Sequence, residues 1–381
     1  MTMLVDVNAV RALLDKEGCG SFIGGIESLI EQTADRLAEA YRRWDEFAKG
    51  SRIGIHSVRG DIELMPVADH HYYAFKYVTG FPQNPERNLP NVMAFGALSS
   101  VETGKPLFLC ELAIATAIRT AAMSALVARH LAREDSRSMA IIGCGAQCDF
   151  QILAFNALLG IEKFYLYDVD AAAMNKVVEN LSEGEIEFVL PDRSINDSQA
   201  SIRKVLERHP DIVTTVTADK TNATILTADM IRPGMHINAV GGDAPGKTEL
   251  DKKILELEHA RVVVEFEEQT RAEGEVQQMP PDFPVIEFHE IIRGIKPGRE
   301  NSRQVTIHDS VGFALSDYAV LRLLYDKTQQ YKLGTVVDLV PSETPDVKNL
   351  FRKVRRGDNE IGLSCDSPHA AGTRPLRYFR G

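Results

Sequence analysis

Two glycine-rich loops in this sequence have the composition of nucleotide-binding loops. The first begins in the apolar stretch Met139-Ala-Ile-Ile, continues as Gly143-Cys-Gly145-Ala-Gln-Cys148, and leads into a helical pattern. Gly143 permits a tight turn, and Gly145 lets a pyrophosphate approach the backbone at the helix N-terminus, whose free N–H groups favour anions. Cys148 is small enough for the third position, where the helix packs on the strand. This loop therefore predicts a dinucleotide site.

An aspartate follows the next strand pattern at the position expected for a ribose ligand. Asp168 comes directly after the stretch Lys163–Tyr167 and 25 residues after Gly143. Its carboxylate can accept hydrogen bonds from both hydroxyls of an adenosine ribose, whereas it repels a 2′-phosphate. NAD is therefore favoured over NADP. The alternative, an ordinary turn with a solvated aspartate, stays open at this point.

The second loop, Gly241-Gly-Asp-Ala-Pro-Gly-Lys-Thr248, fits the phosphate-binding pattern G-x-x-x-x-G-K-[ST] in every position. Taken literally, it predicts an NTPase. A phosphate cradle, however, works through converging backbone N–H groups, and Pro245 removes one of them while Asp243 adds a negative charge. The strand pattern Val262–Glu265 ends in Glu rather than the Asp of a Walker-B strand. The chemistry of the loop therefore argues against a phosphate.

Asp243 has a different use if its loop follows a parallel strand. The stretch His236–Val240 predicts such a strand, and a carboxylate at its C-terminal tip faces the ligand crevice of a doubly wound sheet. We expect Asp243 to act there on a substrate beside the dinucleotide. Thr248 and Asp251 predict the start of a helix over 249–255 without any phosphate. The alternative that Asp243 only caps a turn stays open.

Four charged side chains precede these loops in the chain. Arg52, Glu63 and Lys76 lie in a stretch with alternating polarity, so on their own they favour solvent-exposed charge on an antiparallel sheet. Arg119 interrupts an otherwise apolar, Ala-rich helical pattern, where a guanidinium requires an anionic partner. As a set, Arg52, Lys76 and Arg119 are suited to hold an α-carboxylate, with Glu63 and Asp243 facing a cationic amine.

Three regimes of hydrophobic spacing precede the first glycine-rich loop. Residues 7–48 have helical spacing, broken by glycines at 18–25 that lack a preceding strand and predict a turn between helices. Residues 52–110 alternate with a period of two, which predicts an antiparallel sheet. Residues 111–132 predict one Ala-rich helix.

From residue 139 onward, strand and helix patterns alternate as in a doubly wound parallel sheet of the α/β class. The predicted strands are 139–142, 163–167, 186–189, 212–215, 236–240 and 262–265, and the predicted helices include 150–159 and 171–181. Residues 305–340 then predict a strand, a helix at 316–327 and a strand at 336–340, and we expect them to rejoin the N-terminal part. The predicted division is a substrate-binding α+β domain of residues 1–131 and 305–356, an NAD-binding Rossmann-type domain of residues 132–304, and a loosely ordered tail at 357–381.

An excess of acidic residues limits the partners of the chain. Its 381 residues include 43 Lys and Arg against 54 Asp and Glu, and the net charge of −11 argues against a non-specific nucleic-acid binder. The segment 348–381 is the exception, with eight basic residues against three acidic ones, and predicts a solvated tail. Asp6 stands where a signal peptide would require an apolar run, so the sequence does not predict a signal peptide. No stretch approaches the roughly 18 apolar residues of a membrane span. A cytoplasmic location is therefore expected. The 5 cysteines predict neither a disulfide framework nor a metal site.

Seven stretches of the sequence follow the pattern of one known family. They are Glu63-Leu-Met-Pro, Ala74-Phe-Lys-Tyr-Val, Arg87-Asn-Leu with Val92-Met-Ala-Phe-Gly, Ala117-Ile-Arg-Thr-Ala-Ala, Ile142-Gly-x-Gly-Ala-Gln, Asn238-Ala-Val-Gly-Gly-Asp-x-Pro-Gly-Lys-Thr-Glu-Leu, and Asp309-Ser-Val-Gly-Phe-Ala-Leu. In these stretches the sequence resembles the ornithine cyclodeaminase/mu-crystallin family, over about residues 20–340. In that family the false Walker string is the catalytic loop, so the resemblance also argues against an NTPase.

The resemblance implies an enzyme that converts L-ornithine to L-proline and ammonia, a lyase reaction in which NAD is reduced and reoxidised in each turnover. Arg52, Lys76 and Arg119 would hold the substrate carboxylate, and Asp243 would be the acid/base group. The other implied substrate contacts are Glu63, Met65 and Val311. The implied cofactor contacts are Asn91, Arg119, Gly143, Gly145, Ala146, Gln147, Asp168, Thr217, Val240, Gly241, Gly242, Lys247 and Ser310. Asn91 departs from the family pattern, which has a threonine there, and the resemblance further implies a homodimer formed through the strand-rich domain.

Several other activities stay open at this stage. An NAD(P)-dependent amino-acid dehydrogenase would accumulate reduced cofactor, and a ketimine reductase would consume it. Lysine is an alternative substrate, because one methylene alters the fit of a pocket by only about 1–3 kcal/mol. A binding protein without turnover, as mu-crystallins illustrate, is the alternative from a different class.

Overall fold

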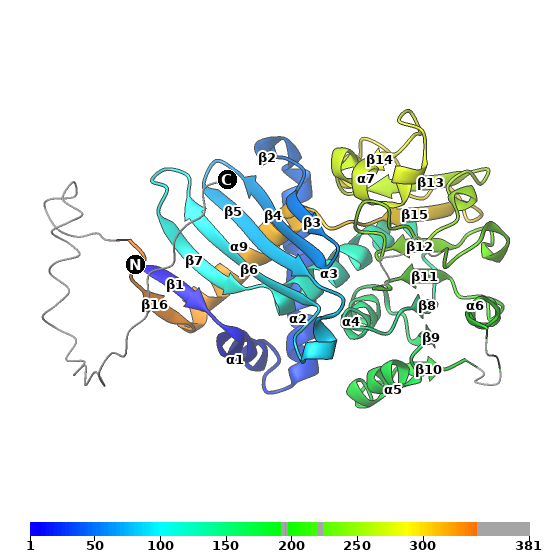
Figure 1. Cartoon of the computed structure of the whole chain (residues 1–381), viewed down its shortest axis with the longest axis horizontal. Coiled ribbons are helices and arrows are strands. Elements are labelled where there is room, and N and C mark those ends of the chain that lie inside the picture. The colour runs from blue at the N-terminus through cyan, green and yellow to red at the C-terminus, as the bar shows by residue number, and fades with distance from the viewer. Residues whose placement is uncertain (192–194, 196, 219–223, 341–381) are drawn as a thin grey trace, which may run out of the picture. The chain divides into compact units, whose positions relative to one another are not determined.

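Two β-sheets organise the part of the chain that the computed structural model describes, residues 1–191, 195, 197–218 and 224–340 (Figure 1). Residues 1–337 form one compact unit. The predicted tail at 357–381 and residues 341–356 of the predicted first domain lie outside the described residues.

The first sheet contains the strands predicted between residues 52 and 110. Its order is β16 (Thr335–Val337), β1 (Thr2–Val5), β7 (Pro106–Glu111), β6 (Val92–Ser100), β5 (Tyr72–Gly80), β4 (Gly60–Ala68) and β2 (Ala48–Lys49), with β3 (Ile53–Ser57) also paired to β4. Every pairing is antiparallel except that of β1 with β7, which is parallel. The prediction of an antiparallel sheet in this region is confirmed.

Four helices accompany the first sheet. They are α1 (Val7–Glu17), α2 (Phe22–Arg42), α3 (Ala113–Leu131) and α9 (Ala314–Tyr331). Of these, α3 and α9 pack on one face of the sheet, α1 contacts β1, and α2 packs on the other three helices. The N-termini of α1 and α2 are capped, because Asp6 accepts a hydrogen bond from the backbone N–H of Ala9 and Ser21 accepts one from Gly24. Alternate residues of β5, including Ala74 and Lys76, face the helices.

The second sheet is wholly parallel, as the alternating strand and helix patterns of the sequence predicted. Its order is β10 (Glu187–Val189), β9 (Lys163–Tyr167), β8 (Ser138–Ile142), β11 (Ile212–Thr215), β12 (His236–Ala239), β15 (Val305–Asp309), β13 (Ala260–Val264) and β14 (Ile286–Glu287). Its helices are α4 (Cys148–Leu159), α5 (Ala171–Asn180), α6 (Ser198–Leu206), α7 (Glu267–Glu273) and α8 (Phe288–Ile292). Short 3₁₀ turns occur at Trp44–Glu46 (η1), Asn84–Arg87 (η2), Ala228–Met230 (η3), Lys252–Ile254 (η4) and Glu275–Gln278 (η5). The α/β class with a Rossmann-type sheet is therefore confirmed.

One hydrophobic core continues from the first sheet into the second. It includes Met65 and Phe108 of the first sheet, Leu37 of α2, and Met139 and Phe164 of the second sheet. A smaller core covers the opposite face of the second sheet. Among the described helices, none has the length and hydropathy needed to cross a membrane.

Two elements differ from the sequence-based expectation. The strand expected near residue 305 is β15, but it pairs with β12 and β13 in the parallel sheet and does not rejoin the N-terminal part; only α9 and β16 do so. The helix predicted over 249–255 is absent, and only η4 forms there. Its first residues are instead held in a parallel bridge with Leu226, whose N–H donates to the Glu249 carbonyl oxygen and whose carbonyl oxygen accepts from the N–H of Asp251. The division into domains stays a prediction.

Candidate active site

The first glycine-rich loop joins β8 to α4 and lies against the end of β9. Gly143 has a φ of +108°, and a Cβ at this position would lie 2.7 Å from the carbonyl oxygen of Val216, so a side chain is excluded. The N–H of Cys144 donates to the Asp168 carboxylate at 2.6 Å, and the N–H of Asp170 donates to its other oxygen at 2.9 Å. These bonds hold Asp168 beside the loop, where a ribose ligand is required.

The N-terminus of α4 is open to an anion. Gly145 and Ala146 are exposed, and the N-cap residue Gln147 makes no side-chain capping bond. The Gln147 Oε1 atom is buried without a hydrogen-bond partner among the described residues. Lys176 donates to the Gly145 carbonyl oxygen at 3.2 Å, which fixes the loop from the side of α5. The free N–H groups of this turn are suited to a pyrophosphate.

The second glycine-rich loop is held by two buried carboxylates that the sequence analysis missed. Glu249 accepts hydrogen bonds from the N–H groups of Thr217 at 2.9 Å and Gly241 at 3.2 Å. Glu275 in turn accepts from the N–H groups of Glu249 at 2.7 Å and Leu250 at 3.0 Å. Burial raises the pKa of both carboxyl groups. Within the loop, the N–H of Gly246 donates to Gln277 at 2.7 Å and that of Lys247 donates to the Ala244 carbonyl oxygen at 3.0 Å, so donors that a phosphate cradle would use are satisfied within the protein, which argues against an NTPase.

Asp243 lies at the accessible side of this loop. Its carboxylate is 53% exposed, and its Oδ1 atom lies 3.1 Å from the ammonium of Lys247, which is itself buried. Lys247 also donates to the carbonyl oxygen of Thr217 at 3.1 Å. A carboxylate with one neighbouring cation and access to solvent can receive a ligand and exchange protons with it.

Lys76 and Arg119 are buried together, which makes the solvent-exposed interpretation wrong for Lys76. Lys76 on β5 is 1% exposed, and its ammonium lies 3.0 Å from Asp317 of α9. Arg119 of α3 lies 3.1 Å from the same carboxylate, which supplies the anionic partner predicted for it. Burial, with the added charge of Arg119, lowers the pKa of Lys76 to about 8. Two cations therefore share one carboxylate and leave positive charge for a ligand anion.

Arg52 lies among acidic and carbonyl oxygens rather than facing an open space. Its Nη1 atom donates to Glu63 at 2.9 Å, and its Nη2 atom donates to the carbonyl oxygens of Val311 at 2.5 Å and Gly312 at 2.9 Å. Its Nε atom lies 3.1 Å from Glu273 of α7. The Nη1 and Nη2 atoms therefore donate within the protein, whereas Nε makes no hydrogen bond among the described residues.

The pair Lys76 and Arg119 and the pair Arg52 and Glu63 form two charged groups, which meet at Gly312, between β15 and α9. The Gly312 carbonyl oxygen accepts from Arg52, and a Cβ at Gly312 would lie 2.7 Å from a guanidinium nitrogen of Arg119. Gly312 has a φ of +75°, so a side chain here would be both strained and in collision with Arg119. Met65, opposite Lys76 in the register of β4 and β5, and Val311 add buried apolar surface. The structure thus brings Arg52, Lys76, Arg119 and Glu63 into one neighbourhood.

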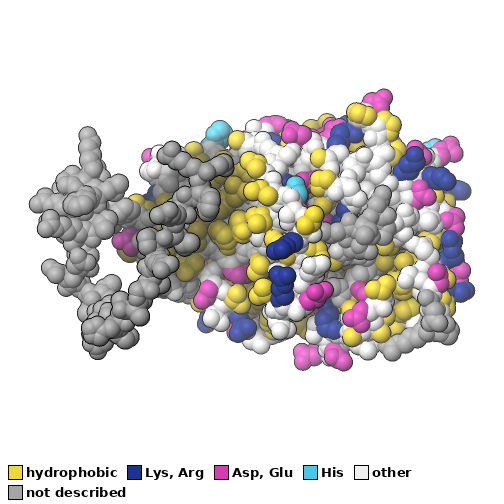
Figure 2. All heavy atoms as spheres, viewed as in Figure 1, with side chains coloured by type: hydrophobic (Ala, Val, Ile, Leu, Met, Phe, Trp, Pro, Cys, Tyr) yellow, Lys and Arg dark blue, Asp and Glu magenta, His cyan; other side chains and the backbone are white. Residues whose placement is uncertain are grey.

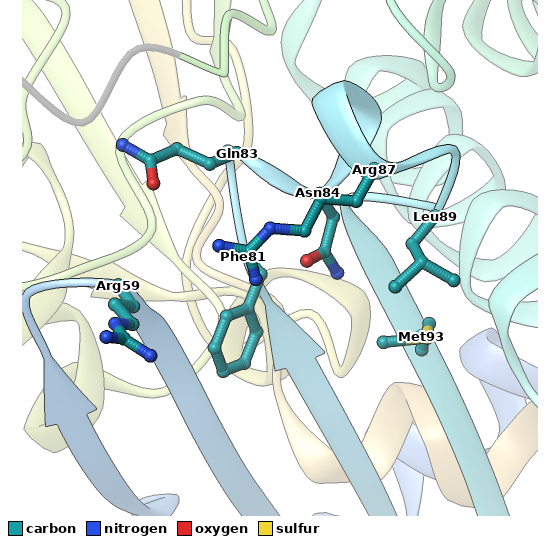
Figure 3. Close-up of a pocket in the computed structure, with 7 residues that line it drawn as sticks. All are labelled: Arg59, Phe81, Gln83, Asn84, Arg87, Leu89 and Met93. Carbon is teal, nitrogen blue, oxygen red and sulfur yellow. The ribbon is translucent and has the colours of Figure 1, made fainter.

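Two predicted cofactor contacts, Ser310 and Asn91, lie outside both glycine-rich loops. Ser310, after β15, donates to the buried Glu265 at 2.7 Å. Asn91 precedes β6, and its Oδ1 atom is buried without a hydrogen-bond partner among the described residues. Its backbone carbonyl accepts from the N–H of Phe81, which borders a pocket of about 230 Å³ (Figure 3). The pocket is lined by Arg59, Phe81, Gln83, Asn84, Arg87, Leu89 and Met93.

A family model matches residues 23–332 and is described as the ornithine cyclodeaminase/mu-crystallin family. The chain belongs to this family. An ornithine cyclodeaminase of Brucella suis is 47% identical to it over 346 residues, which cover 91% of this chain and 93% of the relative. An archaeal alanine dehydrogenase dimer with bound NAD has a TM-score of 0.78 and 28% identity, and covers 89% of this chain and 99% of its own. A lysine cyclodeaminase structure has a TM-score of 0.77 and 26% identity over 89% of this chain and 96% of its own.

Four acidic residues near the site were not predicted from the sequence. They are Glu249, Glu273, Glu275 and Asp317. The sequence around Asp317 could have indicated its role, because a carboxylate in an apolar helical stretch requires a cationic or hydrogen-bonding partner, just as Arg119 requires an anionic one. The three glutamates stand in polar segments, where a solvated side chain was the plain expectation.

Proposed function

We propose that this chain is an ornithine cyclodeaminase, which converts L-ornithine to L-proline and ammonia with NAD as a cofactor that is regenerated in each turnover. The observation that carries the proposal is the pair of adjacent charged groups. Lys76 and Arg119 share one carboxylate, whereas Arg52 faces Glu63 and Glu273, with Asp243 nearby. The substrate carboxylate fits the group formed by Lys76 and Arg119, and a substrate ammonium fits the acidic group around Arg52. The relative from Brucella suis supports this substrate.

The residues present fit NAD. Asp168 would receive the adenosine ribose, and the open turn at Gly145 to Gln147 would receive the pyrophosphate. The buried side-chain oxygens of Gln147 and Asn91 lack hydrogen-bond partners in the part of the chain that the structure describes, as acceptors in an occupied site would require. When bound, NAD supplies a hydride acceptor for C2 of the substrate and then the donor that returns the hydride.

The protein's own residues bind the substrate and move protons. Lys76 and Arg119 hold the α-carboxylate, which fixes C2 relative to the dinucleotide loop. Asp243 exchanges a proton with the α-amine, and Lys247 orients its carboxylate. The side-chain amine, held near C2, attacks within the same molecule, and such an arrangement raises the effective concentration greatly.

Arg52 takes a different part in this scheme from the one predicted from the sequence. Its Nη atoms donate to Glu63 and to two carbonyl groups, and its Nε atom lies beside Glu273, so we assign the substrate carboxylate chiefly to Lys76 and Arg119. Arg52 then positions the acidic side chains that face the amino groups. Met65 and Val311 remain proposed pocket walls.

The outer face of the first sheet is the proposed homodimer surface. Figure 2 shows hydrophobic side chains gathered over the strands of this sheet, and the exposed ones include Ile53, Ile55, Leu64, Tyr73 and Phe95. A contiguous apolar face of this kind is typical of a protein interface. The related alanine dehydrogenase is described as a dimer. A cytoplasmic location stays a prediction.

The test is incubation of the purified protein with L-ornithine and NAD. Ammonia and L-proline should form in equal amounts without growth of NADH absorbance. NADH that accumulates in step with turnover would instead identify an amino-acid dehydrogenase, the activity named for one structural relative. Faster turnover of L-lysine, or consumption of NADH with a cyclic imine, would identify the other enzymatic alternatives. Binding without turnover would identify a crystallin-like protein.

A further inference from the structure

We propose that Glu273, on α7, is the carboxylate that binds the side-chain ammonium of the substrate and accepts its proton. The identity of the substrate rests on the proposed function, but the assignment of Glu273 rests on contacts in the structure. Sequence reasoning had assigned the amine end to Glu63 and Asp243.

Glu273 has an unmet capacity to bind a donor. Its side chain is 9% exposed, and its Oε2 atom lies 3.1 Å from Arg52 Nε. The geometry of this ion pair is not that of a hydrogen bond, so Oε2 is buried without a hydrogen-bond donor among the described residues. Glu63 differs, because its Oε2 atom accepts a hydrogen bond from Arg52 at 2.9 Å. A buried carboxylate oxygen that lacks a donor is the better receptor for an ammonium.

The charges around Glu273 also favour a cation. The charged groups that act on it most strongly are Arg52 directly before β3, Glu63 on β4, Asp243 in the loop after β12, and His56 on β3. Arg52 is the one permanent cation in this set, and it stands against three carboxylates. The arrangement carries excess negative charge in a largely buried place, which an incoming ammonium neutralises.

The same surroundings suit a proton acceptor. Burial, together with Glu63 and Asp243, raises the pKa of Glu273 to about 7 against the opposing charge of Arg52. The proton moves from the side-chain ammonium to the carboxylate, which gives a neutral amine and a carboxylic acid. The freed electron pair on nitrogen forms the bond to C2 of the imine, and the π electrons of that imine move to the α-nitrogen. A proton then passes from the new ring nitrogen to the α-nitrogen, which takes up a second proton, and the bond between C2 and the α-nitrogen breaks with its electron pair leaving on ammonia. The lone pair of the ring nitrogen forms the C=N bond of a cyclic iminium ion.

The test compares Glu273→Gln with the full-length wild type and with Glu268→Gln. Gln keeps the shape of Glu273 but cannot be protonated or carry charge. Glu268 is exposed on the same helix and bonds to Ser51, so it controls for a change in α7. The profile of kcat/KM against pH is measured for L-ornithine, and NAD affinity is measured by titration.

We expect the wild type and Glu268→Gln to show an ionisation near pH 7 that Glu273→Gln lacks, with turnover at pH 8 reduced by about 100-fold or more. NAD affinity should be unchanged. An ionisation and a rate like those of the control would overturn the assignment. If Glu273→Gln fails to bind NAD, Glu273→Asp decides: a slower enzyme that retains the ionisation supports the proposal, and one without it refutes the proposal.

A binding measurement separates this inference from the proposed function. Affinities for L-ornithine and L-norvaline, which has the same carbon chain without the side-chain amine, are measured with NAD present. The wild type should prefer L-ornithine, and Glu273→Gln should lose about tenfold or more of that preference. A preference that survives the substitution contradicts the role of Glu273 even if the wild type makes no proline. If the wild type makes no proline but the substitution abolishes the preference, the proposed function fails and the inference stands.

Discussion

Replacement of Asp317 by Asn should destabilise the folded protein by removing the shared partner of two buried cations. Lys76 and Arg119 lie 3.0 and 3.1 Å from the Asp317 carboxylate. Asn has nearly the same shape, so the substitution changes charge with little change in packing. Removing one partner of a buried ion pair costs about 3–5 kcal/mol, because the remaining charge is left uncompensated.

The loss should depend on pH through Lys76. In the wild type the pKa of this ammonium is lowered to about 8, and without Asp317 it should fall further. In the unfolded chain Lys stays protonated to a pKa of about 10.4, so the burial penalty is present at low pH and is relieved as pH rises through the folded pKa. The stability difference between wild type and variant should therefore be largest below about pH 7 and should narrow by pH 8. The part due to Arg119 persists, since Arg does not deprotonate.

Urea unfolding followed by tryptophan fluorescence measures this difference, because Trp44 is buried in the core. The control is Asp326→Asn on the same helix, where a half-exposed carboxylate pairs with Arg36 and should contribute about 1 kcal/mol or less. A loss for Asp317→Asn no larger than that of the control would refute the reasoning. A loss that grows between pH 7 and 9 would also refute it.

Three further predictions concern the nucleotide loop, the second sheet and the proposed dimer. Asp168→Asn should weaken NAD binding by about tenfold and reduce discrimination against NADP, as titration of both cofactors would show, whereas unchanged affinities would exclude a ribose role. Burial raises the pKa of Asp309 to about 7, so its contribution to stability is present below about pH 4 and is lost as pH rises to 7. In Asp309→Asn, the decrease in the free energy of unfolding between pH 4 and pH 7 should be smaller by up to about 4 kcal/mol. An unchanged pH dependence of the free energy of unfolding, measured with urea, would contradict this. Phe95→Glu on the exposed face should yield a monomer by light scattering, and a persistent dimer would move the interface elsewhere.

Much of the fold was predictable because hydrophobic spacing reports directly on burial. The strands Lys163–Tyr167 and Ile212–Thr215 were predicted with the bounds that the structure shows, since parallel strands buried on both faces are short, apolar runs. The helix predicted over 249–255 failed because backbone hydrogen bonds to Leu226 hold its first residues in a bridge and overrode a local capping pattern.

The candidate site was less predictable, because ion pairs join residues far apart in the chain. Lys76 and Asp317 are separated by more than two hundred positions, and period-two spacing could not distinguish a solvated Lys76 from a buried one. The apolar pattern around Arg119 did indicate an anionic partner, though not which one. The same limit applied to Arg52, whose residue type suggested a carboxylate clamp, which stays a prediction, but could not indicate its hydrogen bonds to Glu63, Val311 and Gly312.

The return of hydride to the carbon it left is the central claim about this enzyme, and an isotope label at C2 tests it most directly. L-ornithine that carries deuterium at C2 is incubated with unlabelled NAD, and the product is analysed by mass spectrometry and NMR. We expect L-proline with deuterium at C2, equimolar ammonia and no accumulated NADH. Proline without deuterium, or deuterated NADH formed in step with ammonia, would contradict it.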